Sequence, residues 1–183
     1  EKNEFLNALA DGGFQAEVLS RLHYSPGVLV EDRDYANSLE KTMGLLNNTN
    51  SIIYEAAFLH DNLFIRTDIL VKEDNVIKVI EVKAKSFDST LEDIFKTKSG
   101  SIRPEWRTYL FDLAFQKYVV EKNYPECKIE SYLMLADKSK KASIDGLNQL
   151  FQITNDPNIR TGIRRKVHSL KETGNPFMEP RNL

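Results

Sequence analysis

The residues best suited to chemistry are acidic side chains inside otherwise hydrophobic segments. Glu55, Asp68 and Glu81 each lie in a run rich in Ile, Val, Leu or Phe, and Lys83 follows Glu81 by two positions. An ionised carboxylate is costly to bury unless a cation or a metal compensates it. These residues therefore indicate a site that holds a cation. The alternative is a half-exposed sheet on which Lys83 and Arg66 pair with the carboxylates across strands.

The spacing of the apolar residues predicts the strands that position these groups. Residues 51–86 read as three antiparallel strands joined by short polar turns at 60–62 and 73–75. Because strand side chains alternate between faces, we expect Glu81 and Lys83 to share one face with Ile77 and Val79. The same alternation predicts two further shared faces, one of Ile53, Glu55, Ala57 and Leu59 and one of Phe64, Arg66, Asp68 and Leu70.

The order of these motifs resembles a known superfamily of enzymes. Asp68, followed by Glu81-Val82-Lys83 on the next strand, resembles the signature of the PD-(D/E)XK nucleases in their RecB-like branch. The short segments IYEAAF, RTDIL and EVKAKS precede a long helical run with Gln116. This order is similar to that of bacterial RecB-like nucleases. The resemblance covers residues 12–136. It implies an α/β (α+β) restriction-endonuclease-like fold, in which helices flank a central mixed sheet with an antiparallel catalytic meander.

The resemblance also implies a set of catalytic residues, namely Asp68, Glu81, Lys83 and Gln116. Asp68, Glu81 and the backbone carbonyl of Val82 would bind Mg²⁺ or Mn²⁺, since both ions prefer oxygen ligands. Lys83 would position the attacking water or stabilise the phosphate. Glu55, on the adjacent strand, would support a second metal ion.

The resemblance also implies a metal ligand on the helix that precedes the three strands, and two residues are candidates for it. RecB-like nucleases usually carry a histidine on this helix, and the helical run at 14–22 contains none. Glu17 is the first candidate for this role and His23 the second. Alternatively, Glu17 is a solvated helix residue and His23 stabilises the helix C-terminus. The family pattern also places Tyr four residues after the glutamine, where this chain has Val120.

The formal net charge is −2 and the pI is about 6.0, so the chain as a whole does not attract nucleic acid. Any contacts with nucleic acid must therefore come from local groups of basic residues. We expect phosphate contacts from Lys85, Arg66, Lys96, Lys98, Arg164 and Arg165. The long polar segment at 87–104 is of a length that is often functional in a compact domain. A mobile solvent loop there and a solvated helix face at 160–166 are the alternatives. The expected partner is DNA, in single-stranded or branched form rather than as tightly bound duplex.

Composition predicts one domain. The 183 residues are 41% hydrophobic and 28% charged, which fits a single globular domain over residues 1–183. We expect a core at 12–136 and a helical or irregular extension at 137–183, and we allow for a longer natural protein. A lone cysteine, Cys127, excludes an internal disulfide and fits a reducing compartment. No apolar run is long enough to cross a bilayer, so we expect a cytoplasmic protein of open oligomeric state.

Apolar periodicity predicts the elements around the three strands. We expect helices at 2–10, 14–22, 35–46 and 105–122, short helices near 91–95 and 144–151, and a further strand at 127–136. Asp11-Gly12-Gly13 is expected to separate the first two helices, and Pro104 fits the start of the long one. The core therefore has the element order α-β-β-β-α-β.

These expectations describe a metal-dependent deoxyribonuclease that acts in DNA repair, recombination or defence. A catalytically silent module of the same fold, which binds nucleic acid or a protein, is the first alternative. An unrelated small-molecule enzyme or interaction domain, whose strands carry surface ion pairs, is the second.

Overall fold

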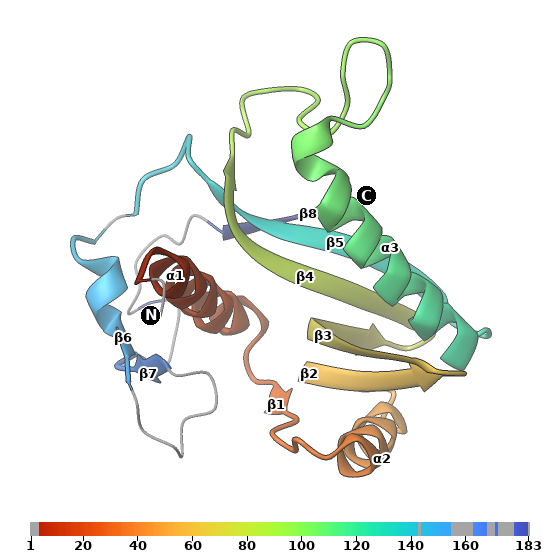
Figure 1. The fold of residues 1–183 in the computed structure, drawn as a ribbon. Helices are drawn as coiled ribbons and strands as arrows, with labels where there is room; N and C mark the ends of the chain where they lie inside the picture. The colour runs from red at the N-terminus through yellow and green to blue at the C-terminus, as the bar shows by residue number, and fades with distance from the viewer. Residues whose placement is uncertain (1–3, 143, 155–162, 168–170, 172–177, 183) are drawn as a thin grey trace.

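A mixed six-stranded sheet forms the centre of the computed structural model (Figure 1). The structure describes residues 4–142, 144–154, 163–167, 171 and 178–182. In this sheet the strand order is β1-β2-β3-β4-β5-β8. The six strands are β1 (Val28–Leu29), β2 (Asn50–His60), β3 (Leu63–Glu73), β4 (Val76–Phe87), β5 (Lys128–Asp137) and β8 (Met178–Asn182).

Helices cover both faces of this sheet. The α-helices of the described residues are α1 (Glu4–Arg21), α2 (Tyr35–Leu46) and α3 (Pro104–Asn123). Two short 3-10 helices, η1 (Leu22–Tyr24) and η2 (Leu147–Leu150), and a small hairpin of β6 (Phe151–Ile153) and β7 (Ile163–Arg165) complete the described elements. No helix among the described residues is long and apolar enough to cross a membrane.

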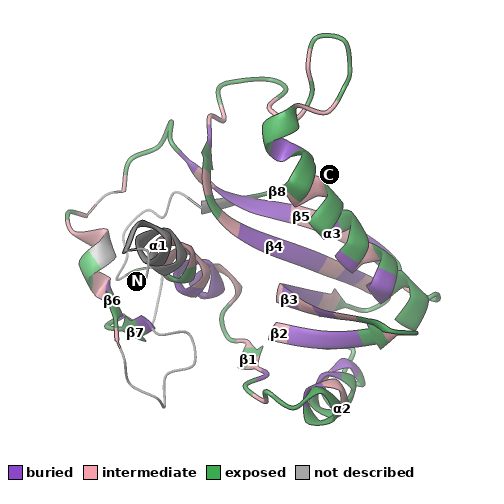
Figure 2. Ribbon diagram, in the orientation of Figure 1, coloured by how far each residue is buried: buried purple, intermediate pink, exposed green. Residues whose placement is uncertain are grey.

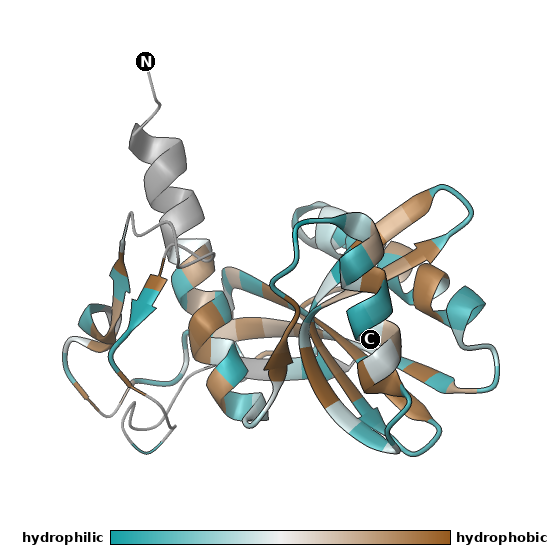
Figure 3. Cartoon of the chain, turned by 90° about the horizontal axis from the view of Figure 1, so that it is seen from below, coloured by the Kyte–Doolittle hydropathy of each residue, from teal (hydrophilic) through white to brown (hydrophobic). Residues whose placement is uncertain are grey.

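The predicted antiparallel meander is confirmed. β2 pairs with β3 from Asn50↔Glu73 to His60↔Leu63, and β3 pairs with the first part of β4. Asp61 and Asp74, in the two turns, have φ angles of 52° and 50°, in the left-handed region that Asp tolerates in tight turns. Figure 3 shows hydrophobic residues along the strands and hydrophilic ones in the connecting turns. β4 and β5 are parallel, with α3 connecting them. The chain thus has the predicted α-β-β-β-α-β order and belongs to the mixed α+β class.

Two hydrophobic cores lie on opposite faces of the sheet (Figure 2). On one face, Leu113 of α3 packs in a cluster with Val79 and Leu133. On the other face, Val18 of α1 packs in a cluster with Ile80. Val79 and Ile80 are neighbours in β4, so alternation along this strand places α1 and α3 on opposite sides. We call these the α1 side and the α3 side.

Tyr54 of β2 holds the C-terminal end of α1. Its hydroxyl lies 3.0 Å from the carbonyl oxygen of Arg21 and 2.9 Å from that of Tyr24. These carbonyls end a helix and lack partners of the ordinary helical kind. Its ring also explains Gly27, because a Cβ atom there would lie 2.4 Å from the ring carbon that carries the hydroxyl. Tyr54 thereby determines where the last turns of α1 lie against the sheet.

Two predictions about helices are wrong, one near the N-terminus and one between β4 and α3. A single helix, α1, runs through Gly12 and Gly13, where the sequence predicted a break. Glycine costs only about 1 kcal/mol in a helix interior, so packing of the following turns on the sheet can maintain the helix through it. No helix forms at 91–95 either. That segment consists of turns, in which the Asp93 side chain accepts a hydrogen bond from the Lys96 N–H at 3.0 Å.

The C-terminal segment at 137–183 contains less helix and more strand than predicted. Only η2 is helical within 144–151, and Phe151 starts β6 instead of ending a helix, because its backbone pairs with Arg165. Gln15 of α1 donates a side-chain hydrogen bond to the Phe151 carbonyl at 2.8 Å. The segment at 163–165 is a strand rather than a helix, and residues 160–162 lie outside the described residues. β8 adds an antiparallel strand beside β5.

The Tyr54 contact gives a first prediction. Tyr54→Phe keeps the ring but removes the hydroxyl from two carbonyl groups at the end of α1. We expect a loss of about 1 kcal/mol in the free energy of unfolding, measured by urea denaturation. Tyr35→Phe is the matched control, because the Tyr35 side chain is exposed and its ring contact with Phe64 would remain. Equal midpoints for the two variants would contradict this role.

Candidate active site

Asp68 lies where two neighbouring strands separate. Backbone pairing between β3 and β4 runs from Glu73↔Val76 to Ile69↔Ile80 and ends there. Directly beyond the last pair, Oδ2 of Asp68 accepts a hydrogen bond from the Val82 N–H at 2.7 Å. The side chain thus replaces a backbone partner for β4. This bond orients the Asp68 carboxyl group at the opening between the strands.

Three carboxyl groups lie close together at this opening between β3 and β4, on the α1 side of the sheet. Glu17 of α1, Glu55 of β2 and Asp68 of β3 each offer an oxygen atom, and these atoms all lie within 4.8 Å of one another. The three side chains are partly buried and come from three different elements. We call this group the carboxylate cluster. A set made only of oxygen donors suits hard divalent cations such as Mg²⁺ and Mn²⁺.

Glu55 reaches the cluster through an unusual backbone conformation. Its φ angle is 58°, which is uncommon for a residue other than glycine and is often associated with functional sites. Around it the alternation of β2 is shifted, because Tyr54 packs on the α1 side while both Ile53 and Ala56 pack on the α3 side. The predicted face of Ile53, Glu55, Ala57 and Leu59 is therefore wrong for Ile53.

The alternation of β3 shifts in the same region. Ile65 packs on the α3 side and Ile69 on the α1 side, although regular alternation would place both on one face. Leu70 accordingly packs on the α3 side, while Asp68 meets Glu17 of α1. The predicted shared face of Phe64, Arg66, Asp68 and Leu70 is therefore wrong for Leu70, because the pairing of β3 with β2 skips Asp68 between Thr67 and Ile69.

Two arginines partly neutralise the carboxylate cluster. Arg21 is buried, donates to Glu17 and lies 3.4 Å from Glu55. Arg66 lies 3.7 Å from the other oxygen of Glu55 and also donates to the backbone carbonyls of Val30 and Asp32. Arg66, one of the residues predicted to contact DNA, lies beside Glu55, and its contact with DNA stays a prediction. Sequence reasoning missed Arg21, although its position four residues after Glu17 is the usual spacing of a helical ion pair.

Burial and mutual repulsion raise pKa values in the cluster. Burial raises the pKa of Asp68 well above its ordinary value, and the nearby carboxylates Glu81 and Glu17 raise it further. The Val82 N–H and Lys83 only partly oppose this rise in the pKa of Asp68. Burial likewise raises the pKa of Glu17, with Arg21 opposing and Glu55 adding to the shift. A proton or a cation is therefore favoured between these side chains.

Glu81 and Lys83 lie on the α3 side, as predicted. Glu81 is 5% exposed, and Oε2 accepts a hydrogen bond from Gln116 Nε2 at 2.7 Å. Lys83 donates to its other oxygen and lies 3.6 Å from Asp112, while its Nζ is 6.0 Å from the centre of the Tyr109 ring. The stripe of Tyr109, Asp112 and Gln116 on α3 therefore covers the Glu81–Lys83 pair.

Lys83 and Gln116, the two partners of Glu81, have features useful for binding an anion and a water molecule. Burial lowers the pKa of Lys83, but Glu81, Asp68 and Asp112 outweigh it, so the pKa lies above its ordinary value and Lys83 stays cationic. Oε1 of Gln116 is buried and has no hydrogen-bond partner among the described residues. A buried acceptor without a partner is costly, so Oε1 is suited to receive a donor from a bound water or ligand.

The structure separates the predicted metal ligands into two groups. Asp68, Glu55 and Glu17 come together, whereas Glu81 lies outside that cluster and is held by Lys83 and Gln116. Val82, predicted to contribute its carbonyl, contacts Asp68 through its N–H. Of the two helix-side candidates, Glu17 lies beside Asp68.

His23, the second helix-side candidate, lies outside the cluster. It lines a pocket of about 270 Å³ with Tyr24, Ile80 and Tyr132, and burial lowers its pKa.

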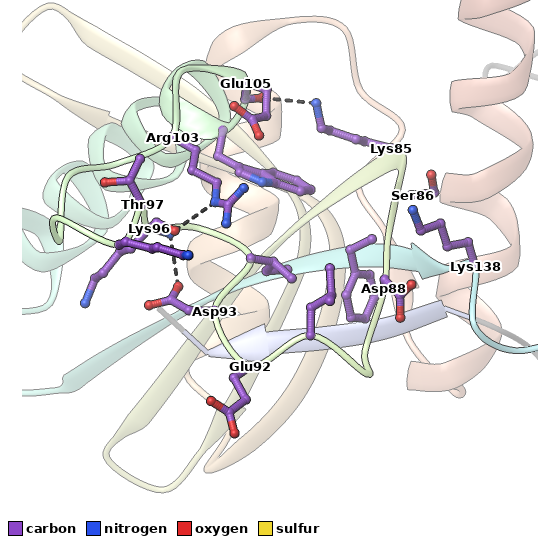
Figure 4. Close-up of a pocket in the computed structure, with 15 residues that line it drawn as sticks. Lys85, Ser86, Asp88, Glu92, Asp93, Lys96, Thr97, Arg103, Glu105 and Lys138 are labelled. Carbon is purple, nitrogen blue, oxygen red and sulfur yellow. Dashed lines mark hydrogen bonds between the residues drawn. The ribbon is translucent and has the colours of Figure 1, made fainter.

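The predicted nucleic-acid contacts are also divided. Lys85, Lys96 and Lys98 line a pocket of about 710 Å³ near the start of α3, together with Arg103 and Lys138 (Figure 4). Lys85 donates to the Glu105 carbonyl at 3.1 Å, and its Nζ lies 4.7 Å from the centre of the Trp106 ring and 5.4 Å from that of Tyr109. Tyr109 thus adjoins both this pocket and Lys83.

Arg164 and Arg165 lie apart from that pocket. Both are exposed on β7, whose Ile163 packs in the α1-side core.

Comparisons with known proteins do not identify a family or a function for this chain. No protein-family model, curated protein or solved structure matches this chain.

Asp68 provides a test of the repulsion in the cluster. Its raised pKa means that stability from this group is complete below the unfolded pKa of about 3.9 and is lost as the pH rises through the folded pKa. Asp68→Asn removes this loss and keeps an oxygen for the Val82 N–H. Without divalent cations, we expect the variant to be more stable than the wild type near neutral pH.

Urea denaturation across the range from about pH 4 to neutral measures this effect. The wild type should lose stability with rising pH more steeply than Asp68→Asn. Asp61→Asn, in an exposed turn, is the matched control and should keep the wild-type slope. A destabilised Asp68→Asn protein near neutral pH would show that the carboxylate is fully compensated by its neighbours.

Proposed function

We propose that this protein is a divalent-metal-dependent deoxyribonuclease of the RecB-like PD-(D/E)XK type, with a restriction-endonuclease-like core. The observation that carries this proposal is the position of Asp68 between two groups of complementary chemistry. It meets Glu17 and Glu55 in an all-oxygen cluster, and it accepts a hydrogen bond from Val82, which lies between Glu81 and Lys83 in β4. The sequence order of these residues matches the nuclease signature.

The carboxylate cluster fits Mg²⁺ or Mn²⁺ in donor type and in charge. Asp68, Glu55 and Glu17 would hold the ion, while Glu81 lies outside this cluster and is held by Lys83 and Gln116. A bound ion would supply Lewis-acid activation of water and of the scissile phosphate. Arg21 and Arg66 neutralise part of the same charge, so the ion would compete with Arg21 for Glu17 and Glu55.

Residues of the α3 side would act on the substrate phosphate. Lys83, cationic and partly exposed, can donate to a phosphate oxygen and stabilise the charge that develops during hydrolysis. Glu81 accepts from Lys83 and Gln116 and so orients both side chains. The free acceptor of Gln116 can orient a water molecule by accepting a hydrogen bond from it. DNA in single-stranded or branched form is the proposed substrate.

A catalytically silent binding module is the alternative function. The ion pairs of Arg21 with Glu17 and Glu55 favour it, because a structural network could compensate these carboxylates without any metal. The two functions differ in whether the cluster binds divalent cations and in whether the Lys83 side chain matters for cleavage.

Metal binding distinguishes Glu17 from His23. Glu17→Gln removes a cluster carboxylate and should weaken Mn²⁺ affinity by about tenfold or more in calorimetric titration. His23→Gln, also at the end of this helical segment but outside the cluster, should leave the isotherm unchanged. A wild-type protein that binds no divalent cation, or one that loses affinity equally in both variants, would contradict the proposed site.

Lys83 tests the proposed chemistry. If Lys83 stabilises the phosphate, Lys83→Ala should lower cleavage of labelled single-stranded and branched DNA by about 10²-fold or more. Metal affinity should stay the same or rise slightly, because a nearby positive charge is removed. Lys78→Ala is the matched control, since Lys78 lies on the same strand and pairs with Glu73 at 2.6 Å.

Melting temperature, metal isotherm and cleavage rate are measured on both lysine variants. Lys78→Ala should cleave at the wild-type rate. A Lys83→Ala protein that is destabilised but fully active would overturn the assigned mechanism, and a wild type that cuts RNA faster than DNA would overturn the DNA assignment.

A further inference from the structure

An exposed row of aromatic side chains lies on α3. Phe111 is 60% exposed, Phe115 40% and Tyr118 45%. Their spacing of four and three residues places them on one face of the helix. We call this group the aromatic face. Large aromatic side chains are usually buried, so three in a row on the surface of one helix indicate a binding surface.

The aromatic face runs beside the candidate active site. Phe111 directly precedes Asp112, which lies 3.6 Å from Lys83, and Phe115 directly precedes Gln116, which donates to Glu81. Successive residues of an α-helix are about 100° apart around its axis. The aromatic rings therefore lie on the flank of α3 next to the residues that cover Glu81 and Lys83. At the C-terminal end, Tyr118 contacts His60 of β2, with ring centres 6.1 Å apart.

Cations bound this face at both ends. Arg107, four residues before Phe111, is exposed. Lys122, four residues after Tyr118, is also exposed, and its Nζ lies 5.5 Å from the centre of the Tyr118 ring. The spacing of Arg107, Phe111, Phe115, Tyr118 and Lys122 continues along one face of α3.

Two acidic residues of α3 near this face lie close to lysines. Asp112 lies 3.6 Å from Lys83, and Glu121 lies 3.6 Å from Lys117. Arg107 and Lys122 thus place a positive charge at each end of the aromatic face, although the whole chain has a formal net charge of −2.

We propose that the aromatic face binds single-stranded nucleic acid, with bases stacked on Phe111 and Phe115 and phosphates near Arg107 and Lys122. Aromatic rings between cations are the usual platform for unpaired strands, because every base has a face that can stack. In a duplex those faces are covered by neighbouring bases. That the bound strand continues into the site rests on the proposed nuclease function, whereas the binding itself does not.

Fluorescence anisotropy in EDTA tests the binding without cleavage. The probes are labelled dT20, U20 and a fully paired hairpin. Phe111→Ala and Phe115→Ala should each weaken binding of single strands by about tenfold. Phe115→Leu should weaken it nearly as much, because leucine keeps an apolar contact but cannot stack on a base.

Phe14→Ala is the matched control for these variants. Phe14 is 43% exposed on α1, on the opposite side of the sheet, and its removal should leave affinity unchanged. Binding of dT20 or of U20 supports the inference, and the tighter probe identifies the preferred sugar. Wild-type affinity in both Phe→Ala variants, or no binding of either single strand by the wild type, would overturn it.

Self-association is the competing use of the aromatic face. If light scattering shows a wild-type oligomer that Phe111→Ala disperses, while single strands bind equally to both proteins, this face joins two copies of the chain and the inference is wrong. Failure of the nuclease proposal gives a different pattern. In that case metal-dependent cleavage is absent, while binding of single strands still depends on Phe111 and Phe115.

Discussion

Repulsion among acidic side chains is the constraint on which the site depends. Glu17, Glu55 and Asp68 meet in a partly buried space, and the nearby Glu81 adds negative charge. Negatively charged oxygen atoms as close as those of the carboxylate cluster repel one another in a poorly solvated environment. Arg21, Arg66 and Lys83 compensate part of the charge, and a divalent cation would compensate it further. Burial raises the pKa of Asp68 well above its ordinary value, and repulsion from Glu81 and Glu17 raises it further.

The fold holds these groups together through departures from regular sheet geometry. β3 and β4 separate beyond Ile69↔Ile80, and the Asp68 side chain takes over a backbone hydrogen bond of β4. Glu55 adopts a left-handed backbone conformation in the middle of β2. Such conformations cost free energy and persist only where surrounding contacts enforce them. Tyr54, the neighbour of Glu55, supplies one such contact by binding the end of α1.

Much of this arrangement was predictable from local patterns, and the rest depends on long-range contacts. Turn residues and alternation predicted the meander and the shared face of Glu81 and Lys83, because β4 keeps regular alternation there. The faces of Ile53 and Leu70 were wrong, since no pattern in the sequence signals that β2 and β3 shift alternation around Glu55 and Asp68. β8 was also missed, because its pairing with β5 joins segments far apart in the chain.

We propose that the carboxylate cluster holds a divalent cation. The most direct measurement is anomalous diffraction from crystals soaked in MnCl2, which locates the metal independently of any activity. We expect a manganese peak bounded by Glu17, Glu55 and Asp68, with the Arg21 side chain moved away from the two glutamates. Crystals that show no peak at this position, with Arg21 still paired to Glu17 and Glu55, would contradict it.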